Sequence, residues 1–165
     1  MKNKKKIRTG IWFFGLSGTG KSFASKFTGK YHKNCLIIDG DVVRKYVSFD
    51  LGYSKKDRDK QIKRVLGISR IAIESNLFPI ISTVYMNSKI AGIAKQNRIE
   101  VIKIERDMKK IFKMNKVYKN KKNVVSLDIK YPKITKKSFF PVLNIFLDTI
   151  FGYLISRETT FFLFL

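Results

Sequence analysis

Residues 15–22, GLSGTGKS, decide the fold expected for this chain. They satisfy the pattern of a glycine, four residues, a glycine-lysine pair and a serine or threonine, which defines a phosphate-binding loop. The apolar run at residues 11–14 suits a buried strand, and residues 23–27 can open a helix. Because such a loop joins a strand to a helix, this context favours the motif over a chance glycine-rich turn. The stretch predicts that the chain binds a nucleoside triphosphate.

The residue types within the loop have physical reasons. Side chains at Gly15, Gly18 and Gly20 would keep backbone N–H groups from wrapping a phosphate chain. A helix starting near Lys21 directs the positive end of its dipole at the same anion. Lys21 would reach the outer phosphates, and the Ser22 hydroxyl would ligate Mg²⁺. We therefore expect ATP and Mg²⁺ as cofactors, with the ATP-binding loop formed by Gly15, Ser17, Gly18, Thr19, Gly20, Lys21 and Ser22.

The composition is strongly basic. The chain has 165 residues, enough for one domain with a sizeable core, and a formal net charge of +23. Such a charge suits a nucleic-acid partner. However, the lysines are scattered along a chain rich in Ile, Asn and Phe, which is typical of an AT-rich genome. We favour this compositional explanation, expect no specific nucleic-acid partner, and note that the charge would steer small anionic nucleotides to the protein.

The two ends of the chain carry the remaining compositional signals. Residues 1–6 are basic without a following signal-peptide apolar region, so the cytoplasm is the expected location. Residues 138–165 are rich in Phe and Leu but lack a run of about 18 to 20 uncharged residues, so no transmembrane span is expected. We divide the chain into a phosphate-loop domain, 1–137, and an atypical apolar segment, 138–165. That segment could pack on the domain, touch a membrane or be an altered or truncated end.

Alternating strand and helix patterns indicate an α/β fold. A second apolar run, residues 35–38, ends in Asp39-Gly40-Asp41. A strand–helix–strand order of this size implies a right-handed parallel unit, and ligands of such sheets bind beyond the carboxyl ends of the strands. Asp39 and Asp41 should therefore lie beside the phosphate loop, where carboxylates suit Mg²⁺ coordination and deprotonation of a hydroxyl. The alternative role of either residue is to cap the following helix.

The most regular helical pattern follows, from about residue 54 to residue 75. Ser54 and Asp57 resemble a capping box. The apolar face of this helix consists of Ile62, Val65, Leu66, Ala72 and Ile73, and the outer face carries Lys60, Lys63 and Arg70. Arg58 and Gln61 lie at the N-terminal end of the inward face. A charged residue there needs a partner, either an anionic substrate or an Asp.

Further elements are expected downstream. Residues 78–84, 101–104 and 124–127 read as strands, and residues 88–96 as a helix. The lysine-heavy stretch 108–122 could be a solvated helix or a flap over the phosphates. Together the elements predict a phosphate-loop NTPase-type fold of three layers, with a central, mostly parallel sheet flanked by helices.

Three stretches resemble the adenylylsulfate kinase family: GLSGTGKS, IIDGDVVR at residues 37–44 and DLGYSKKDRDKQIKRV at residues 50–65. The last two are specific to this family among phosphate-loop proteins. Weaker matches follow at residues 105–113 and at NVVSLDIKYP, so that the resemblance covers about residues 10–134. It implies a kinase that transfers the γ-phosphoryl group of ATP to the 3′-hydroxyl of adenosine 5′-phosphosulfate.

The resemblance also implies roles for individual residues. Asp41 would accept the hydroxyl proton, and Asp39 would support the metal, so that Lys21, Asp39 and Asp41 are the expected catalytic residues. Arg106 and Lys109 would belong to a lid over ATP. The residues expected at the acceptor nucleotide are Arg44 and Arg58 on its phosphosulfate, Tyr53 where the family stacks a Phe on adenine, and Gln61. A homodimer is the assembly considered.

Several positions depart from the family pattern, mostly on the acceptor side. Gln61 replaces an Asn, Phe23 replaces a hydroxyl residue, and residues 84–88 read VYMNS where the family has Ile-Ser-Pro-Tyr-Arg. In the lid, Met108 and Lys110 replace a Pro and a Gly. Two alternatives therefore stay open. One is a kinase of a cytidine-diphosphate-linked phosphoramidate in surface-polysaccharide modification. The other is an inactive remnant that binds nucleotides or nucleic acid.

Overall fold

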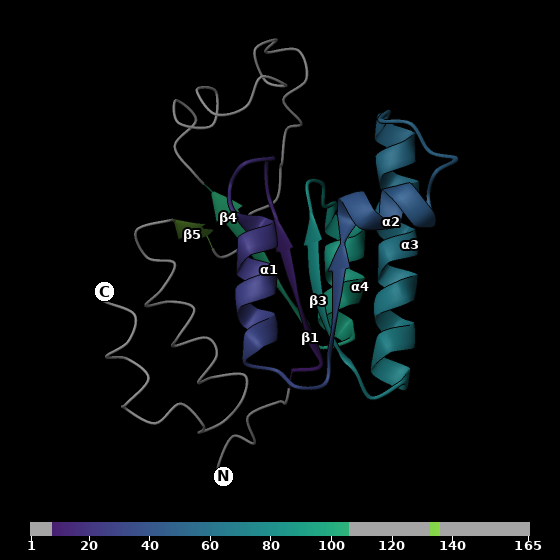
Figure 1. Ribbon diagram of the computed structural model, residues 1–165. Helices are drawn as coiled ribbons and strands as arrows, with labels where there is room; N and C mark the ends of the chain where they lie inside the picture. Colours follow the sequence, from purple (N-terminus) through teal and green to yellow (C-terminus); the bar gives the residue numbers. More distant parts are fainter. Residues whose placement is uncertain (1–7, 106–132, 136–165) are drawn as a thin grey trace.

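The computed structural model describes residues 8–105 and 133–135, which form a twisted sheet with helices on both faces (Figure 1). All neighbouring strands are parallel, in the order β2-β3-β1-β4-β5. The strands are β1 (Gly10–Phe14), β2 (Cys35–Asp39), β3 (Phe78–Thr83), β4 (Ile99–Glu105) and β5 (Lys133–Thr135). The helices are α1 (Lys21–Lys30), α2 (Gly40–Tyr46), α3 (Lys55–Glu74) and α4 (Ser88–Gln96).

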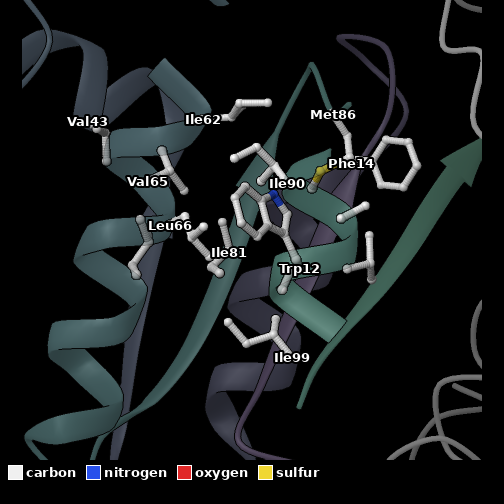
Figure 2. Packing of buried hydrophobic residues seen from close by; sticks show 14 residues of the cluster. Trp12, Phe14, Val43, Ile62, Val65, Leu66, Ile81, Met86, Ile90 and Ile99 are labelled. Carbon is white, nitrogen blue, oxygen red and sulfur yellow. The ribbon is translucent and has the colours of Figure 1, made fainter. Parts of the chain in front are cut away.

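Alternation along β1 divides the core into two layers. Ile11 and Phe13 pack with the apolar side chains of α1, whereas Trp12 and Phe14 pack with those of α3 and α4. Figure 2 shows the second of these clusters, with Trp12 at its centre. The indole Nε1 of Trp12 donates a hydrogen bond of 2.8 Å to Thr83 Oγ1, so that its polar atom is satisfied inside the core. The predicted three-layer α/β fold is confirmed.

Helix α3 forms as its sequence predicts. Its N-cap is Ser54, whose Oγ accepts from the Asp57 backbone N–H at 3.2 Å and donates to Asp57 Oδ2 at 2.7 Å. Most of the predicted apolar face is buried, with Ile73 partly buried against the same cluster, and the outer residues Lys60, Lys63 and Arg70 are exposed. The face of α3 that carries Arg58 and Gln61 therefore points toward the rest of the protein, as the periodicity of the sequence predicted.

Strand β2 runs parallel to β1 in the same sheet, as the strand–helix–strand order predicts. The sequence did not indicate the order of the strands: β3 lies between β1 and β2 and leaves β2 at the edge of the sheet. Leu36 and Ile37 consequently remain 37% and 43% exposed. An apolar run alone does not distinguish an edge strand from a central one.

The C-terminal expectations are largely outside the described residues. The short strand β5 was not predicted, and the predicted strand at residues 124–127, the possible flap at 108–122 and the segment 138–165 lie outside the described ranges. Within residues 8–105 and 133–135, no helix combines the length and apolar character needed to cross a membrane.

Candidate active site

The phosphate loop has a backbone that only glycine adopts easily at three positions. Gly15, Gly18 and Gly20 have φ values of +148°, +81° and +103°. A side chain at Gly15 would also collide with the carbonyl oxygen of Ile104. The Gly15 N–H donates to the Thr83 carbonyl at 3.3 Å, which anchors the loop to the carboxyl end of β3.

Lys21 is the first residue of α1 and lies inside the loop, only 8% exposed. Its Nζ donates to the Leu16 carbonyl at 2.8 Å. Burial lowers the pKa of Lys21 from 10.5 to about 8, although the negative charges of Asp41 and Asp39 act in the opposite direction. An ammonium group held this way is ready to exchange a weak carbonyl partner for a phosphate oxygen.

Asp39 is the centre of a hydrogen-bond cluster at the carboxyl end of the sheet. Its Oδ2 accepts from Ser22 Oγ at 3.0 Å and from Ser82 Oγ at 2.8 Å. Its Oδ1 accepts from the Asp41 N–H at 2.9 Å, which makes Asp39 the N-cap of α2. Burial raises the pKa of Asp39, but the hydrogen bonds from Ser82, the Asp41 N–H and Ser22 outweigh it, so the pKa is lowered from 3.8.

Asp41 occupies the first turn of α2, with an exposed side chain. The sequence left open whether Asp39 or Asp41 caps α2. The structure shows that Asp39 is the cap, so the Asp41 carboxylate is not required for capping. The Asp41 N–H lies 2.9 Å from Asp39 Oδ1, so Asp41 is at the same edge of the sheet, and its negative charge acts to raise the pKa of Lys21. Asp41 can therefore act on a hydroxyl brought to this edge.

The oxygen atoms around Asp39 fit a magnesium ion. The Ser22 hydroxyl and the Asp39 carboxylate are hard oxygen ligands 3.0 Å apart. Within the described ranges, no group of three or more His, Cys, Asp or Glu side chains could hold a metal on its own. Mg²⁺ is usually coordinated by one or two protein groups together with substrate phosphates, and the pair formed by Ser22 and Asp39 fits this type of coordination.

Ser82 was not identified from the sequence. It is the second-last residue of β3, buried to 3% exposure, and its only signal is a hydroxyl near the end of an otherwise apolar strand.

Two arginines expected at the acceptor lie close to the aromatic ring of Tyr53, which is the third residue expected there. The guanidinium carbon of Arg44 lies 4.7 Å from the ring centroid, and that of Arg58 lies 5.8 Å from it. Arg44 Nη1 also donates to the carbonyls of Leu51 and Gly52, at 3.1 and 2.6 Å. Arg44 thus holds the segment before α3 in place, a contact that the sequence did not predict.

Arg58 is attached to the same segment through its Nε, which donates to the Tyr53 carbonyl at 3.0 Å. The Asp partner considered for Arg58 is not found, since no acidic group of the described residues lies within 4.0 Å of its guanidinium nitrogens. The positive charge of Arg58 therefore stays available to an anion.

Gln61 is buried, with 5% exposure, and bridges α3 to the start of α2. Its Nε2 donates to the Gly40 carbonyl at 3.0 Å. Its Oε1 is buried and has no hydrogen-bond partner in the part of the chain that the structure describes. A buried acceptor without a partner is costly, so this oxygen has the capacity to accept a hydrogen bond from a further donor. The expected lid residues Arg106 and Lys109 lie outside the described residues.

Comparisons with known proteins show which family this chain resembles. The model of the adenylylsulphate kinase family matches residues 8–128. An adenylyl-sulfate kinase of Bacteroides thetaiotaomicron is 36% identical over 88 residues, covering 51% of this chain and 44% of that protein. One from Buchnera aphidicola subsp. Schizaphis graminum is 30% identical over 125 residues, covering 66% and 59%. The chain spans about half the length of the curated relatives it matches.

The fold has close counterparts among solved structures. The Mycobacterium tuberculosis APS kinase CysC, in complex with AMPPNP and APS, superposes with a TM-score of 0.71 at 16% identity, over 88% of this chain and 99% of that one. At this identity the likeness supports the fold.

Proposed function

Because this chain belongs to the adenylylsulphate kinase family, we propose that it transfers the γ-phosphoryl group of ATP to the 3′-hydroxyl of adenosine 5′-phosphosulfate. The observation that carries the proposal is the meeting of Lys21, Ser22 and Asp39 with Asp41 at one edge of the sheet. This edge combines a phosphate site with a carboxylate for a hydroxyl proton, which is what phosphoryl transfer to an alcohol requires.

The donor side consists of the phosphate loop and the start of α1. The loop N–H groups and Lys21 would bind the phosphates of ATP, and Lys21 would stabilise the charge that develops on the transferred group. Ser22 and Asp39 would hold Mg²⁺, which when bound neutralises charge on the phosphate oxygens. Ser82 would fix the Asp39 carboxylate in place.

The acceptor side consists of α2, the segment before α3 and the first turns of α3. Asp41 would accept the proton of the attacking hydroxyl. Arg58 would bind the anionic phosphosulfate, while Arg44 holds the Tyr53 ring that would contact the base. The unpartnered Oε1 of Gln61 would accept a hydrogen bond from the acceptor.

The experiment that tests these roles is the substitution Asp41→Asn. It removes the proton acceptor and retains the size of the side chain and the cap supplied by Asp39. Loss of a general base costs about 10²- to 10⁴-fold in rate, and we expect kcat to fall within that range while ATP binding persists. Glu74→Gln, at the exposed far end of α3, is the matched control and should leave kcat unchanged. A fall of less than about tenfold in the Asp41→Asn variant would mean that another group takes the proton.

A further inference from the structure

The loop between β3 and α4, residues 84–87, is tied to α3 through a single carboxylate. Asp59 Oδ1 accepts hydrogen bonds from Tyr85 OH at 3.0 Å and from Asn87 Nδ2 at 2.6 Å. Asn87 is also the N-cap of α4, because its Oδ1 accepts from the Ile90 N–H at 2.8 Å. Asp59 therefore joins the N-terminal part of α3 to the start of α4, in a contact that neither the motifs nor the roles proposed above include.

The Tyr85 phenol stays protonated at neutral pH, so it keeps donating its hydrogen bond to Asp59. Burial, followed by the hydrogen bond to Asp59 and the charge of that carboxylate, raises the pKa of Tyr85 above its ordinary value of 10. The phenol thus stays protonated and keeps donating. The positive charge of Arg58 acts on the pKa of Tyr85 in the opposite direction but does not outweigh these effects.

The 84–87 loop is fixed in turn to the phosphate loop. The Tyr85 carbonyl accepts from Thr83 Oγ1 at 3.0 Å, and Thr83 Oγ1 accepts from the indole of Trp12 at 2.8 Å. The carbonyl of Thr83 accepts from the N–H of Gly15, the first residue of the phosphate loop. Separate hydrogen bonds therefore connect the phosphate loop to the Thr83 backbone, the Thr83 side chain to the Tyr85 backbone, and the Tyr85 side chain to Asp59 on α3.

The first residues of α3 are exposed, so the position of this end of the helix depends on side-chain contacts to the rest of the protein. Gln61 donates a hydrogen bond to the Gly40 carbonyl, and Arg64 forms a bidentate ion pair with Asp50. Asp59, which directly follows Arg58, connects this end of α3 to Tyr85 and thus to the side of the protein that carries the phosphate loop. A shift of α3 here would move Arg58 relative to the phosphate loop, and misplacing reacting groups by about 1 Å can cost about 10²-fold in rate.

We propose that Tyr85 and Asp59 are positioning residues that set the distance between the acceptor-binding end of α3 and the phosphate loop. The inference rests on the proposed function, since it takes Arg58 as an acceptor-binding group. Asn87 holds the carboxylate from the α4 side, so that one oxygen of Asp59 receives both donors. The pair acts through Arg58 and need not touch either substrate.

The test uses the full chain and measures KM for adenosine 5′-phosphosulfate and for ATP separately. Tyr85→Phe removes the hydroxyl and keeps the ring, and Asp59→Asn weakens the acceptor at nearly constant size. Groups within one hydrogen-bond network couple strongly, so we expect each variant to raise KM for the acceptor about three- to thirtyfold, with KM for ATP changed less than about twofold. The double variant should be no worse than the worse single variant. Asn87→Ser, which retains an N-cap oxygen, should show a smaller change of the same kind.

Tyr31→Phe, at the C-cap of α1, is the matched control and should leave both KM values unchanged. The inference is overturned if Tyr85→Phe leaves the acceptor KM unchanged, if it raises both KM values equally, or if the effects of the two single variants multiply in the double variant. A wild-type protein that neither binds nor phosphorylates adenosine 5′-phosphosulfate would overturn the proposed function instead, and this inference with it. The wild-type measurement alone separates the two failures.

Discussion

Replacing Lys21 by Met should stabilise the folded protein while abolishing the proposed phosphoryl transfer. Met retains most of the apolar stem and loses the charge. The Leu16 carbonyl, which Lys21 Nζ contacts, also accepts from Thr19 Oγ1 at 2.8 Å and from the Thr19 N–H at 3.3 Å. The substitution therefore leaves no unpaired carbonyl, and its main effect is to remove a buried charge.

The magnitude follows from the pKa of Lys21, which burial lowers from 10.5 to about 8. Each unit is worth about 1.36 kcal/mol, so the charged form costs the folded state about 3 kcal/mol. Because the folded pKa lies below the ordinary value, the unfolded chain binds more protons between pH 8 and pH 10.5. The cost is fully present below pH 8 and disappears as the pH rises through this window.

The assay is urea unfolding of the wild type and of Lys21→Met at a series of pH values, with the difference in free energy of unfolding as the readout. The variant should be more stable by up to about 3 kcal/mol at pH 7, and the gain should fall toward zero above pH 10.5. Lys26→Met, at an exposed position of the same helix, should show no such gain. A destabilised Lys21→Met variant, or a gain independent of pH, would refute the reasoning.

Three further predictions concern the loop, the core and the Asp39 cluster. Gly15→Ala forces a side chain to a φ of +148° against the Ile104 carbonyl and should lower the free energy of unfolding by about 1–3 kcal/mol, measured in urea. Trp12→Phe leaves a cavity at a fully buried site and the Thr83 hydroxyl without its donor, so thermal unfolding followed by circular dichroism should show a loss of about 2–4 kcal/mol. The lowered pKa of Asp39 contributes stability above its ordinary value of 3.8 that is lost as the pH falls. Asp39→Asn should therefore be less stable than the wild type at pH 7, and acid titration should show the two curves converging below pH 3.8.

Local signals in the sequence predicted much of the fold. The helix expected at residues 88–96 is α4, because Asn87 supplies its cap and the apolar period is unbroken. The strand–loop–helix unit around Lys21 formed where the glycine spacing placed it. Both depend on residues within a few positions of each other.

The rest depends on contacts between distant residues. The edge position of β2 results from β3 entering between β1 and β2, which an apolar run cannot encode. Ser82 reaches Asp39 across 43 positions, and Tyr85 reaches Asp59 across 26. Such pairs have no periodicity that a single sequence reveals, since the sheet order brings them together.

The most direct test of the proposed function follows the transferred phosphate itself. Purified protein is incubated with Mg²⁺, ATP labelled in the γ-phosphate and adenosine 5′-phosphosulfate, with a cytidine-diphosphate-linked phosphoramidate in a parallel reaction. The account predicts labelled adenosine phosphosulfate heavier by one phosphate, ADP in equal amount, and no product from Lys21→Ala. Label on the cytidine compound alone would contradict the proposed acceptor. Bound ATP with no label on either compound would contradict phosphoryl transfer by this chain.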